Sequence, residues 1–459
     1  MSKKPIKSVH LTNYYHKNSG GVSTNYNKLL EAAERHRRFV RLIVPGEHDA
    51  VEEINEFAKI YYVAAPPSPI IDKRYRLMMP WQYIQNETPI RKILIDEMPD
   101  MIEIYDNYSL TLLAGIIRKG KFSQVKRPML VYFTGERFDT IVSSFVSKGK
   151  IGQWFARRLI GNYNLPMFDF YIANSPFVAE ELIESVRGED NPHRSETFFN
   201  KCWQFFRASK IPFTERLKIC PRGVDTVRFN PSKASDRVRR EMREKAGIPE
   251  NSVVVMSSTR LSTEKNIQVL PEIMEVLAKD ERTDFRLLVA GAGPKAEWIA
   301  EETEKRFPGK IVQTGHLDKE TLAEYYASAD VFLHPNPREP FGNVALEAMA
   351  SGVAVVVPNA GGVLSYANEE NAWLSEPTAG GFAATIRKAF EDEPARARKI
   401  ERALETVAAH TTEAANDLLF ATYDAMYEDF ERRNDFFAYQ DVSKADKFTD
   451  LYYTNLPTH

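Results

Sequence analysis

Two glutamates separated by seven residues are the first candidates for chemistry in this chain. Glu339 and Glu347 lie in the run HPNPREPFGNVALEAMASGVAVVVPNAGG, residues 334–362. The run predicts a strand, a loop, a helix and a second strand, with Gly352 ending the helix. Because a carboxylate only accepts hydrogen bonds, this pair is suited to hydroxyl groups, such as those of a sugar and a ribose on either side of a diphosphate.

The helix that carries Glu347 predicts an anion site at its start. Pro340 cannot lie inside a helix but favours its first turn, so the helix begins near residues 341–343. The first amides of a helix lack intrahelical partners, and the helix dipole favours negative charge there. The amides that we expect to face a ligand belong to Phe341, Gly342, Asn343 and Val344.

Two cations upstream complete a candidate diphosphate site. In STRLSTEKNIQVL, Arg260 ends a predicted strand and Lys265 begins the next helix. Two positive charges at the carboxyl end of a strand can neutralise a diphosphate without a metal ion. Ordinary surface charge is the alternative, and it applies more to Lys265 than to Arg260.

Three further loops carry weaker signals for the same ligand. LLVAGAGP has a glycine-rich turn at Gly291, and TGHLD offers His316 and Leu317 to a nucleobase. In NYYHKNSGGVSTNYNKLL, Gly20 and Gly21 separate the first strand from its helix and allow close backbone approach. Each such turn alone is equally typical of an ordinary strand-to-helix connection.

Short apolar strands alternate with amphipathic helices, which predicts an α/β fold. Nearly continuous apolar strands indicate parallel sheets covered on both faces, and the strands are too many for one sheet. We therefore expect two doubly wound, Rossmann-like domains facing across a cleft, where ligands bind at the carboxyl ends of strands. The expected parts are a domain over 1–228, a second domain over 229–420, and a helical extension with a tail over 421–459 that returns to the first domain.

Composition excludes several classes of protein. A hydrophobic content of 43% and a charged content of 27% over 459 residues exclude a disordered or fibrous chain. The net charge of −2 supplies no global field for nucleic acid. Two cysteines and nine scattered histidines predict neither a disulfide scaffold nor a metal site. Without a signal peptide or an apolar spanning segment, we expect a soluble, cytoplasmic protein.

Several runs resemble the retaining nucleotide-sugar glycosyltransferases of family 4, which have the GT-B fold of two Rossmann-like domains. The resemblance is strongest in RGVDTVRFNP, STRLSTEKN, AGAGP, TGHLDKETLAEYYASADVFLHPNPREPFGNVALEAMASG and PNAGG. The first domain matches more loosely, through SGGVSTNYNKLL, PDMIEIYDNYSL and FDFYIANSPFVAEEL. The two glutamates with PFG between them are the specific part of this signature, and the glycine turns are not.

The resemblance implies a role for each candidate residue. Glu347 would hold the ribose hydroxyls, Glu339 the hydroxyls of the donor sugar, and Arg260 and Lys265 the departing diphosphate. Gly20, Gly21 and the amides of residues 341–344 would approach phosphate and sugar oxygens of the donor. The first domain would then bind the acceptor and the second domain the donor.

The resemblance also implies the reaction. A hexose would pass from a nucleotide-diphosphate sugar, with a UDP-sugar favoured, to a lipid, a lipid-linked saccharide or another glycan. Neither a cofactor nor a metal ion would be required, and the configuration would be retained through an oxocarbenium-like state. A sugar-nucleotide-binding scaffold and another enzyme of the same fold, such as an epimerase, are the alternatives.

Two positions depart from the family pattern. After the strand PMLVYFT, Gly135 stands where many relatives carry a histidine that contacts the donor sugar. Glu136 or Asp139 could substitute for that histidine, and both are equally compatible with an ordinary surface. Asn266 stands where glycine is common in relatives.

A basic and aromatic stretch in the first domain raises the question of membrane contact. Trp154 and Phe155 could share a helical face, with four basic residues around them, namely Lys148, Lys150, Arg157 and Arg158. Such a face is typical of peripheral binding to an anionic membrane, here the inner face of the cell membrane. An amphipathic helix packed on the sheet is the more common explanation of the same pattern.

Overall fold

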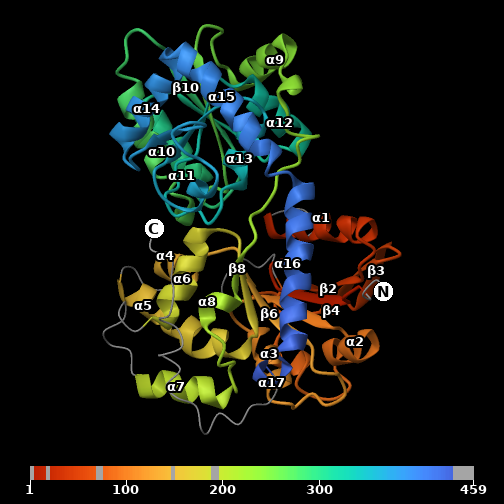
Figure 1. Cartoon of the computed structure of the whole chain (residues 1–459). Coiled ribbons are helices and arrows are strands. Elements are labelled where there is room, and N and C mark those ends of the chain that lie inside the picture. Colours follow the sequence, from red (N-terminus) through yellow and green to blue (C-terminus); the bar gives the residue numbers. More distant parts are fainter. Residues whose placement is uncertain (1–4, 17–20, 69–75, 146–149, 188–195, 438–459) are drawn as a thin grey trace. The chain divides into compact units, whose positions relative to one another are not determined.

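Two separate sheets organise the chain in the computed structural model (Figure 1). The structure describes all residues except 1–4, 17–20, 69–75, 146–149, 188–195 and 438–459, and the side chains of 144, 145, 150, 435 and 436. The chain divides into two compact units. Unit 1 comprises Met1–Cys220 and Asn416–His459, and unit 2 comprises Pro221–Ala415.

The sheet of unit 1 has eight strands in the order β3-β4-β2-β1-β5-β6-β7-β8. Neighbouring strands are parallel except β3, which pairs antiparallel with β4 at one edge. The strands are β1 (Ser8–Thr12), β2 (Val40–Gly46), β3 (Ala50–Asn55), β4 (Ala58–Ala64), β5 (Met101–Tyr105), β6 (Met129–Thr134), β7 (Phe170–Ala173) and β8 (Leu217–Ile219). The helices are α1 (Gly21–Arg35), α2 (Pro89–Glu97), α3 (Thr111–Arg118), α4 (Phe138–Phe145), α5 (Lys150–Leu159), α6 (Pro176–Val186), α7 (Glu196–Phe205), α8 (Phe213–Arg216), α16 (Thr412–Arg432) and α17 (Asn434–Phe437).

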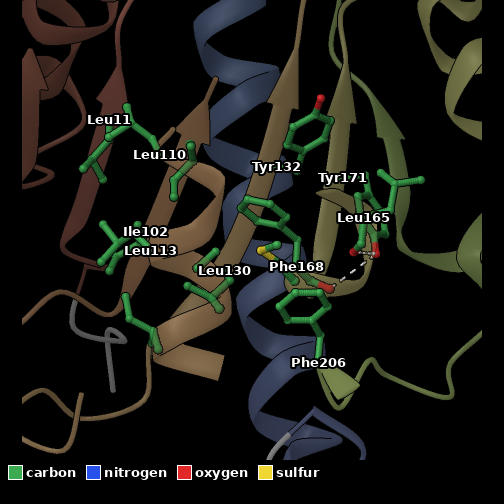
Figure 2. Close-up of a cluster of buried hydrophobic side chains, with 14 of the residues drawn as sticks. Leu11, Ile102, Leu110, Leu113, Leu130, Tyr132, Leu165, Phe168, Tyr171 and Phe206 are labelled. Carbon is green, nitrogen blue, oxygen red and sulfur yellow. Dashed lines mark hydrogen bonds between the residues drawn. The ribbon is translucent and has the colours of Figure 1, made fainter. Parts of the chain in front are cut away.

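Both faces of this sheet are covered by clusters of buried apolar side chains. Successive side chains of a strand point to opposite faces, so a strand such as β5 contributes to both clusters. Val9 and Leu11 of β1 belong to one cluster of buried apolar side chains. Figure 2 shows part of that cluster, where Leu11, Ile102 and Leu130 from three neighbouring strands lie near Leu113 of α3. The nearly continuous apolar strands of the sequence follow from this burial on two sides.

The C-terminal helix α16 packs with α1 on the other face of the sheet (Figure 1). Its residues Phe420, Tyr423, Met426 and Phe430 are buried there. The Tyr423 hydroxyl donates to Glu103 of β5, which also contacts His10 of β1 at 2.9 Å. This buried polar group links α16 to the two central strands, β1 and β5.

The sheet of unit 2 has six parallel strands in the order β11-β10-β9-β12-β13-β14. The strands are β9 (Val253–Ser258), β10 (Phe285–Ala290), β11 (Ile311–Gly315), β12 (Val331–Leu333), β13 (Ala354–Pro358) and β14 (Trp373–Ser375). The helices are α9 (Asp236–Ala246), α10 (Val269–Leu277), α11 (Ala296–Arg306), α12 (Lys319–Ser328), α13 (Asn343–Ala350), α14 (Ala379–Glu391) and α15 (Glu393–Ala408). Buried apolar clusters lie on both faces of this sheet as well.

Local signals fix the ends of several helices in unit 2. Ser235 begins α9 by accepting a hydrogen bond from the Val238 amide, and Gly247 ends it with a φ of 62°. Asp318 begins α12 by accepting from the amides of Glu320 and Thr321. The start of α12 follows β11, so it lies toward the carboxyl end of that strand.

The predicted fold class is confirmed: the chain is α/β, with two Rossmann-like sheets and a helical C-terminal region. In unit 2 the strands β9 and β12 lie side by side although β10 and β11 separate them in sequence. Ligands of such sheets bind where the strand order reverses, outside the carboxyl ends of these two strands. Within the described ranges, none of the helices combines the length and apolar character needed to cross a membrane.

Candidate active site

The candidate site of unit 2 lies where β9 and β12 end. After β9 the chain continues through Arg260 into the short 3₁₀ turn Thr263–Lys265. After β12 it continues through the loop that contains Glu339 and then into α13. Because these strands are adjacent and parallel, residues far apart in sequence meet at one edge of the sheet.

Lys265 and Glu339 form the centre of this site. The Lys265 ammonium donates to both carboxylate oxygens of Glu339 at 3.1 Å, and the Asn336 amide donates to Oε2 at 3.0 Å. Burial raises the pKa of Glu339, but the Lys265 charge and these hydrogen bonds outweigh it and hold the pKa below its usual value. Glu339 is therefore an ionised, oriented acceptor group.

Asn266 explains one departure from the family pattern. Its φ is 55°, in the left-handed region that glycine and asparagine adopt most readily. Its side-chain amide donates to the Pro335 carbonyl at 2.9 Å, which ties the turn after β9 to the loop after β12. Asparagine thus keeps the backbone conformation of a glycine here and adds a link beside the Lys265–Glu339 pair.

Gly342 sets the start of α13. It is the N-cap residue, with a φ of 86°, and a Cβ atom there would lie 2.6 Å from Cγ1 of Val363. The Tyr366 hydroxyl donates to the Gly342 carbonyl at 2.6 Å. The helix begins at Asn343, so the amides of Asn343 and Val344 belong to the first turn and have no intrahelical acceptor.

Glu347 lies one turn into α13 and is partly buried. Burial raises its pKa to about 7, although Lys319 and Arg228 lower it and Asp225 raises it. Its protonation therefore changes near neutral pH. Phe341, by contrast, is buried with its ring centroid 5.2 Å from that of Tyr366, so its side chain belongs to the core.

The other predicted residues of unit 2 lie along the same sheet edge. Arg260 is exposed directly after β9. Gly291 follows β10, and its amide donates to the Gly315 carbonyl after β11 at 2.7 Å. A Cβ atom at Gly291 would lie 1.9 Å from the Thr259 carbonyl oxygen, so close backbone packing explains this glycine. His316 is exposed, whereas Leu317 packs partly against the core.

A sequence profile decides the family of this site. The profile described as "Glycosyl transferases group 1" matches residues 238–406. These residues contain the Lys265–Glu339 pair and all of α13. Over residues 238–406 the chain matches the group 1 glycosyl transferases. The resemblance noted in the sequence is therefore confirmed.

Individual relatives of this glycosyl transferase match it over different lengths. A sulfoquinovosyl transferase of Arabidopsis thaliana is 37% identical over 149 residues, which are 32% of this chain and 27% of that relative. A GDP-mannose-dependent alpha-(1-6)-phosphatidylinositol dimannoside mannosyltransferase of Mycobacterium tuberculosis is 26% identical, over 77% of this chain and 79% of that protein. The match thus spans little more than a quarter of the first relative and most of the second.

A solved structure supports the fold of the glycosyl transferase over nearly its whole length. A glycosyltransferase from Rickettsia africae has a TM-score of 0.65, with 14% identity, over 94% of this chain and 99% of that chain. At this identity the likeness concerns the fold alone. The GT-B fold predicted from the sequence is confirmed.

Unit 1 of the glycosyl transferase holds the remaining predicted residues. Gly21 is the first residue of α1, whereas Gly20 lies outside the described residues. Glu136 is partly buried directly after β6, and its backbone carbonyl accepts from the Thr134 hydroxyl at 2.9 Å. A Cβ atom at Gly135 would lie 3.0 Å from the Tyr105 hydroxyl and 3.2 Å from Nδ2 of Asn174.

Asp139 has a structural role in the described part of unit 1. It is buried and pairs with Arg137 at 2.9 Å, and Arg137 also contacts Glu180 and Glu184 of α6. Arg157 of α5 contacts Glu184 at 2.8 Å and Asp139 at 3.4 Å. Asp139 therefore links α4, α5 and α6 through ion pairs, and it is neither a surface residue nor an open acceptor group.

The basic and aromatic face of α5 is only partly as expected. Arg157 is engaged in those ion pairs, and Arg158 lies over the Trp154 ring at 4.6 Å. Phe155 is exposed, together with Ile151 one turn earlier. Lys148 and the side chain of Lys150 lie outside the described residues. Among the described side chains of α5, Ile151 and Phe155 are thus exposed, whereas Arg157 and Arg158 are only partly exposed.

Sequence reasoning missed two residues of the site, Asn336 and His334. Both lie within five residues of Glu339, and both are buried after β12. Their polar side chains in the short run between a buried strand and Pro340 were the available signal. Among the described residues, no cluster of three or more His, Cys, Asp or Glu is placed to hold a metal ion, and the metal-free reaction stays a prediction.

Proposed function

We propose that this glycosyl transferase moves a hexose from a nucleotide-diphosphate sugar to a lipid, a lipid-linked saccharide or another glycan. The observation that carries the proposal is the Lys265–Glu339 pair at the reversal point of the sheet of unit 2. A cation and an ionised acceptor group lie together there, beside the first turn of α13. A diphosphate and the hydroxyls of a sugar require these two kinds of group side by side.

The roles of the side chains follow from their charges. Arg260 and Lys265 neutralise the diphosphate as the bond between the sugar C1 and the phosphate oxygen breaks, and the first amides of α13 stabilise the same oxygens. Glu339 accepts hydrogen bonds from sugar hydroxyls and Glu347 from those of the ribose. The acceptor oxygen bonds to C1 as its proton passes to the leaving phosphate. The reaction retains configuration through an oxocarbenium-like state and uses no metal ion.

The nucleotide of the donor has two candidates, UDP and GDP. The family resemblance favours UDP, whereas the mycobacterial relative that matches over most of its length is named for GDP-mannose. That relative acts on a phosphatidylinositol dimannoside, which supports a lipid-linked acceptor for this chain as well. A panel of nucleotides separates the two donors directly.

Peripheral contact with an anionic membrane is part of the same proposal. Ile151 and Phe155 are exposed one turn apart on α5, with Arg158 beside Trp154 on the same helix. Apolar side chains that enter the interface next to a cation are typical of helices that lie on a membrane. A lipid-linked acceptor would make such contact useful.

Calorimetric binding of UDP, GDP, ADP and their hexose conjugates, without added metal ion, tests the donor site. We expect one nucleotide series to bind and Glu347→Ala to weaken it. Glu401→Ala, which removes an exposed carboxylate from α15 of the same unit, is the matched control. No binding by the whole panel would refute the donor site.

Release of the nucleotide tests the transfer itself. Free nucleoside diphosphate should accumulate only when an acceptor is supplied, and an acceptor screen should begin with glycolipids. Tight donor binding without turnover toward any acceptor would instead indicate a sugar-nucleotide-binding scaffold. Release without an acceptor would indicate hydrolysis or another reaction on the same fold.

A further inference from the structure

His334 is a buried polar residue of the site without an assigned role. It follows directly after β12, and its amide donates to the Val356 carbonyl of β13 at 2.9 Å, which fixes its backbone. Only 2% of the residue is exposed. Because the neighbouring strand holds its backbone, the position of this imidazole is set by the sheet.

Neither ring nitrogen of His334 has a hydrogen-bond partner among the described residues. Burial lowers the pKa of His334 to about 4, with a further lowering by Lys265 that Glu339 opposes, so the ring is neutral at pH 7. A neutral imidazole has one donor and one acceptor nitrogen. Buried polar groups without partners are costly, so each one in a folded protein requires an explanation.

The nearest candidate partner is the Glu339 carboxylate. His334 Nε2 lies 4.0 Å from Glu339 Oε2, which is beyond hydrogen-bond distance. Lys265 and Asn336 hold that carboxylate at 3.1 and 3.0 Å. The oxygen nearest to the imidazole is therefore already engaged by other donors.

We propose that His334 positions Glu339 by replacing Lys265 at its carboxylate when a donor diphosphate binds. The proposal rests on the proposed function, because it requires that Lys265 contact the diphosphate. An ammonium that turns toward two phosphates leaves a buried carboxylate with one donor fewer, and a movement of about 1 Å brings Nε2 within hydrogen-bond distance. A neutral donor orients Glu339 toward the sugar without competing with the phosphates for a positive charge.

The first test follows the His334 ring by ¹⁵N NMR in the full chain with labelled histidine, using UDP and GDP without a sugar as probes. His334→Gln assigns the signals. We expect Nε2 to shift toward a hydrogen-bonded value when the nucleotide binds, and Lys265→Met to produce the same shift without nucleotide. Calorimetric binding with unchanged His334 signals would overturn the exchange and leave the proposed function intact.

The second test separates positioning of Glu339 from a structural role. In His334→Phe, which keeps the ring without a donor, we expect the Kd of the nucleoside diphosphate to stay within about twofold. The Kd of the nucleotide sugar should rise about tenfold, because one hydrogen bond to a charged group is lost. His334→Gln, which restores a donor, should recover most of that loss. Equal weakening of both ligands would overturn the proposal, whereas absent binding to wild type would overturn the proposed function as well.

Discussion

Replacing Gly342 by alanine tests the geometry at the start of α13. The first cost is conformational, because the residue has a φ of 86° and a side chain in this region costs about 1–2 kcal/mol. The second cost is crowding. The new Cβ atom would lie 2.6 Å from Cγ1 of Val363 and 3.0 Å from the Tyr366 hydroxyl, well inside the roughly 3.5–4.0 Å of a carbon contact.

The two costs add to a sizeable loss of stability. Overpacking of this kind costs about 1–3 kcal/mol, so we expect Gly342→Ala to destabilise unit 2 by about 2–5 kcal/mol in total. Gly315→Ala is the matched control, since Gly315 has a φ of 72° and nothing within 4 Å of a new Cβ atom. It should lose only the conformational part, about 1–2 kcal/mol.

Hydrogen exchange measured by mass spectrometry suits a chain with two units, because it reports the opening free energy of individual segments. Peptides from β12, β13 and α13 should lose more protection in Gly342→Ala than in Gly315→Ala, and peptides of unit 1 should be unchanged. Equal losses in the two variants would refute the crowding by Val363 and Tyr366. An unchanged Gly342→Ala variant would refute the left-handed conformation as well.

Three further predictions concern turnover, binding of the nucleotide sugar and contact with membranes. Glu339→Ala should lower turnover by about a hundredfold at an unchanged fold, measured as acceptor-dependent release of nucleotide, because an oriented acceptor group is lost. Binding of the nucleotide sugar should weaken as the pH falls through about 7, where Glu347 gains a proton. Between pH 8 and pH 6 calorimetry should find a loss of about tenfold. Ile151→Ser with Phe155→Ser should reduce flotation with anionic vesicles, because these exposed side chains would enter the interface.

Each of these predictions has its own control. Glu401→Ala should turn over normally, and normal turnover in Glu339→Ala would remove Glu339 from the site. Glu347→Gln should flatten the pH dependence, so a dependence that persists in it would refute the assignment to Glu347. Phe198→Ser, which changes an exposed phenylalanine on α7, should float as wild type does. Equal flotation of the α5 variant and wild type would refute the membrane contact.

The fold follows from the sequence because its physical causes are local and repeated. Apolar strands buried on both faces require helices on both faces, and alternating strands and helices then lead to parallel sheets. The helix predicted after Gly20 and Gly21 is observed as α1 over Gly21–Arg35. The start of α13 at Asn343 lies within the predicted residues 341–343, with the left-handed Gly342 as its N-cap.

The site is predictable as far as residue types carry its chemistry. The spacing of Glu339 and Glu347 and the placement of Lys265 after a strand suffice to nominate these three residues. Their pairing depends on the adjacency of β9 and β12, a long-range property of the sheet that the local pattern does not contain. His334 could not be predicted either, because its significance lies in the absence of a hydrogen-bond partner among the described residues, which only the structure shows.

The two departures from the family pattern have different physical consequences. Asn266 adopts the backbone conformation of the glycine that it replaces, and its bond to the Pro335 carbonyl adds a link beside the Lys265–Glu339 pair. Gly135 removes a side chain instead, and the Tyr105 hydroxyl and the Asn174 amide lie around the position that a Cβ atom would take. The first departure preserves the geometry of the site in unit 2. The second changes the polar groups that lie after β6. We therefore expect the sugar specificity of this glycosyl transferase to differ from that of histidine-bearing relatives more than its binding of the diphosphate does.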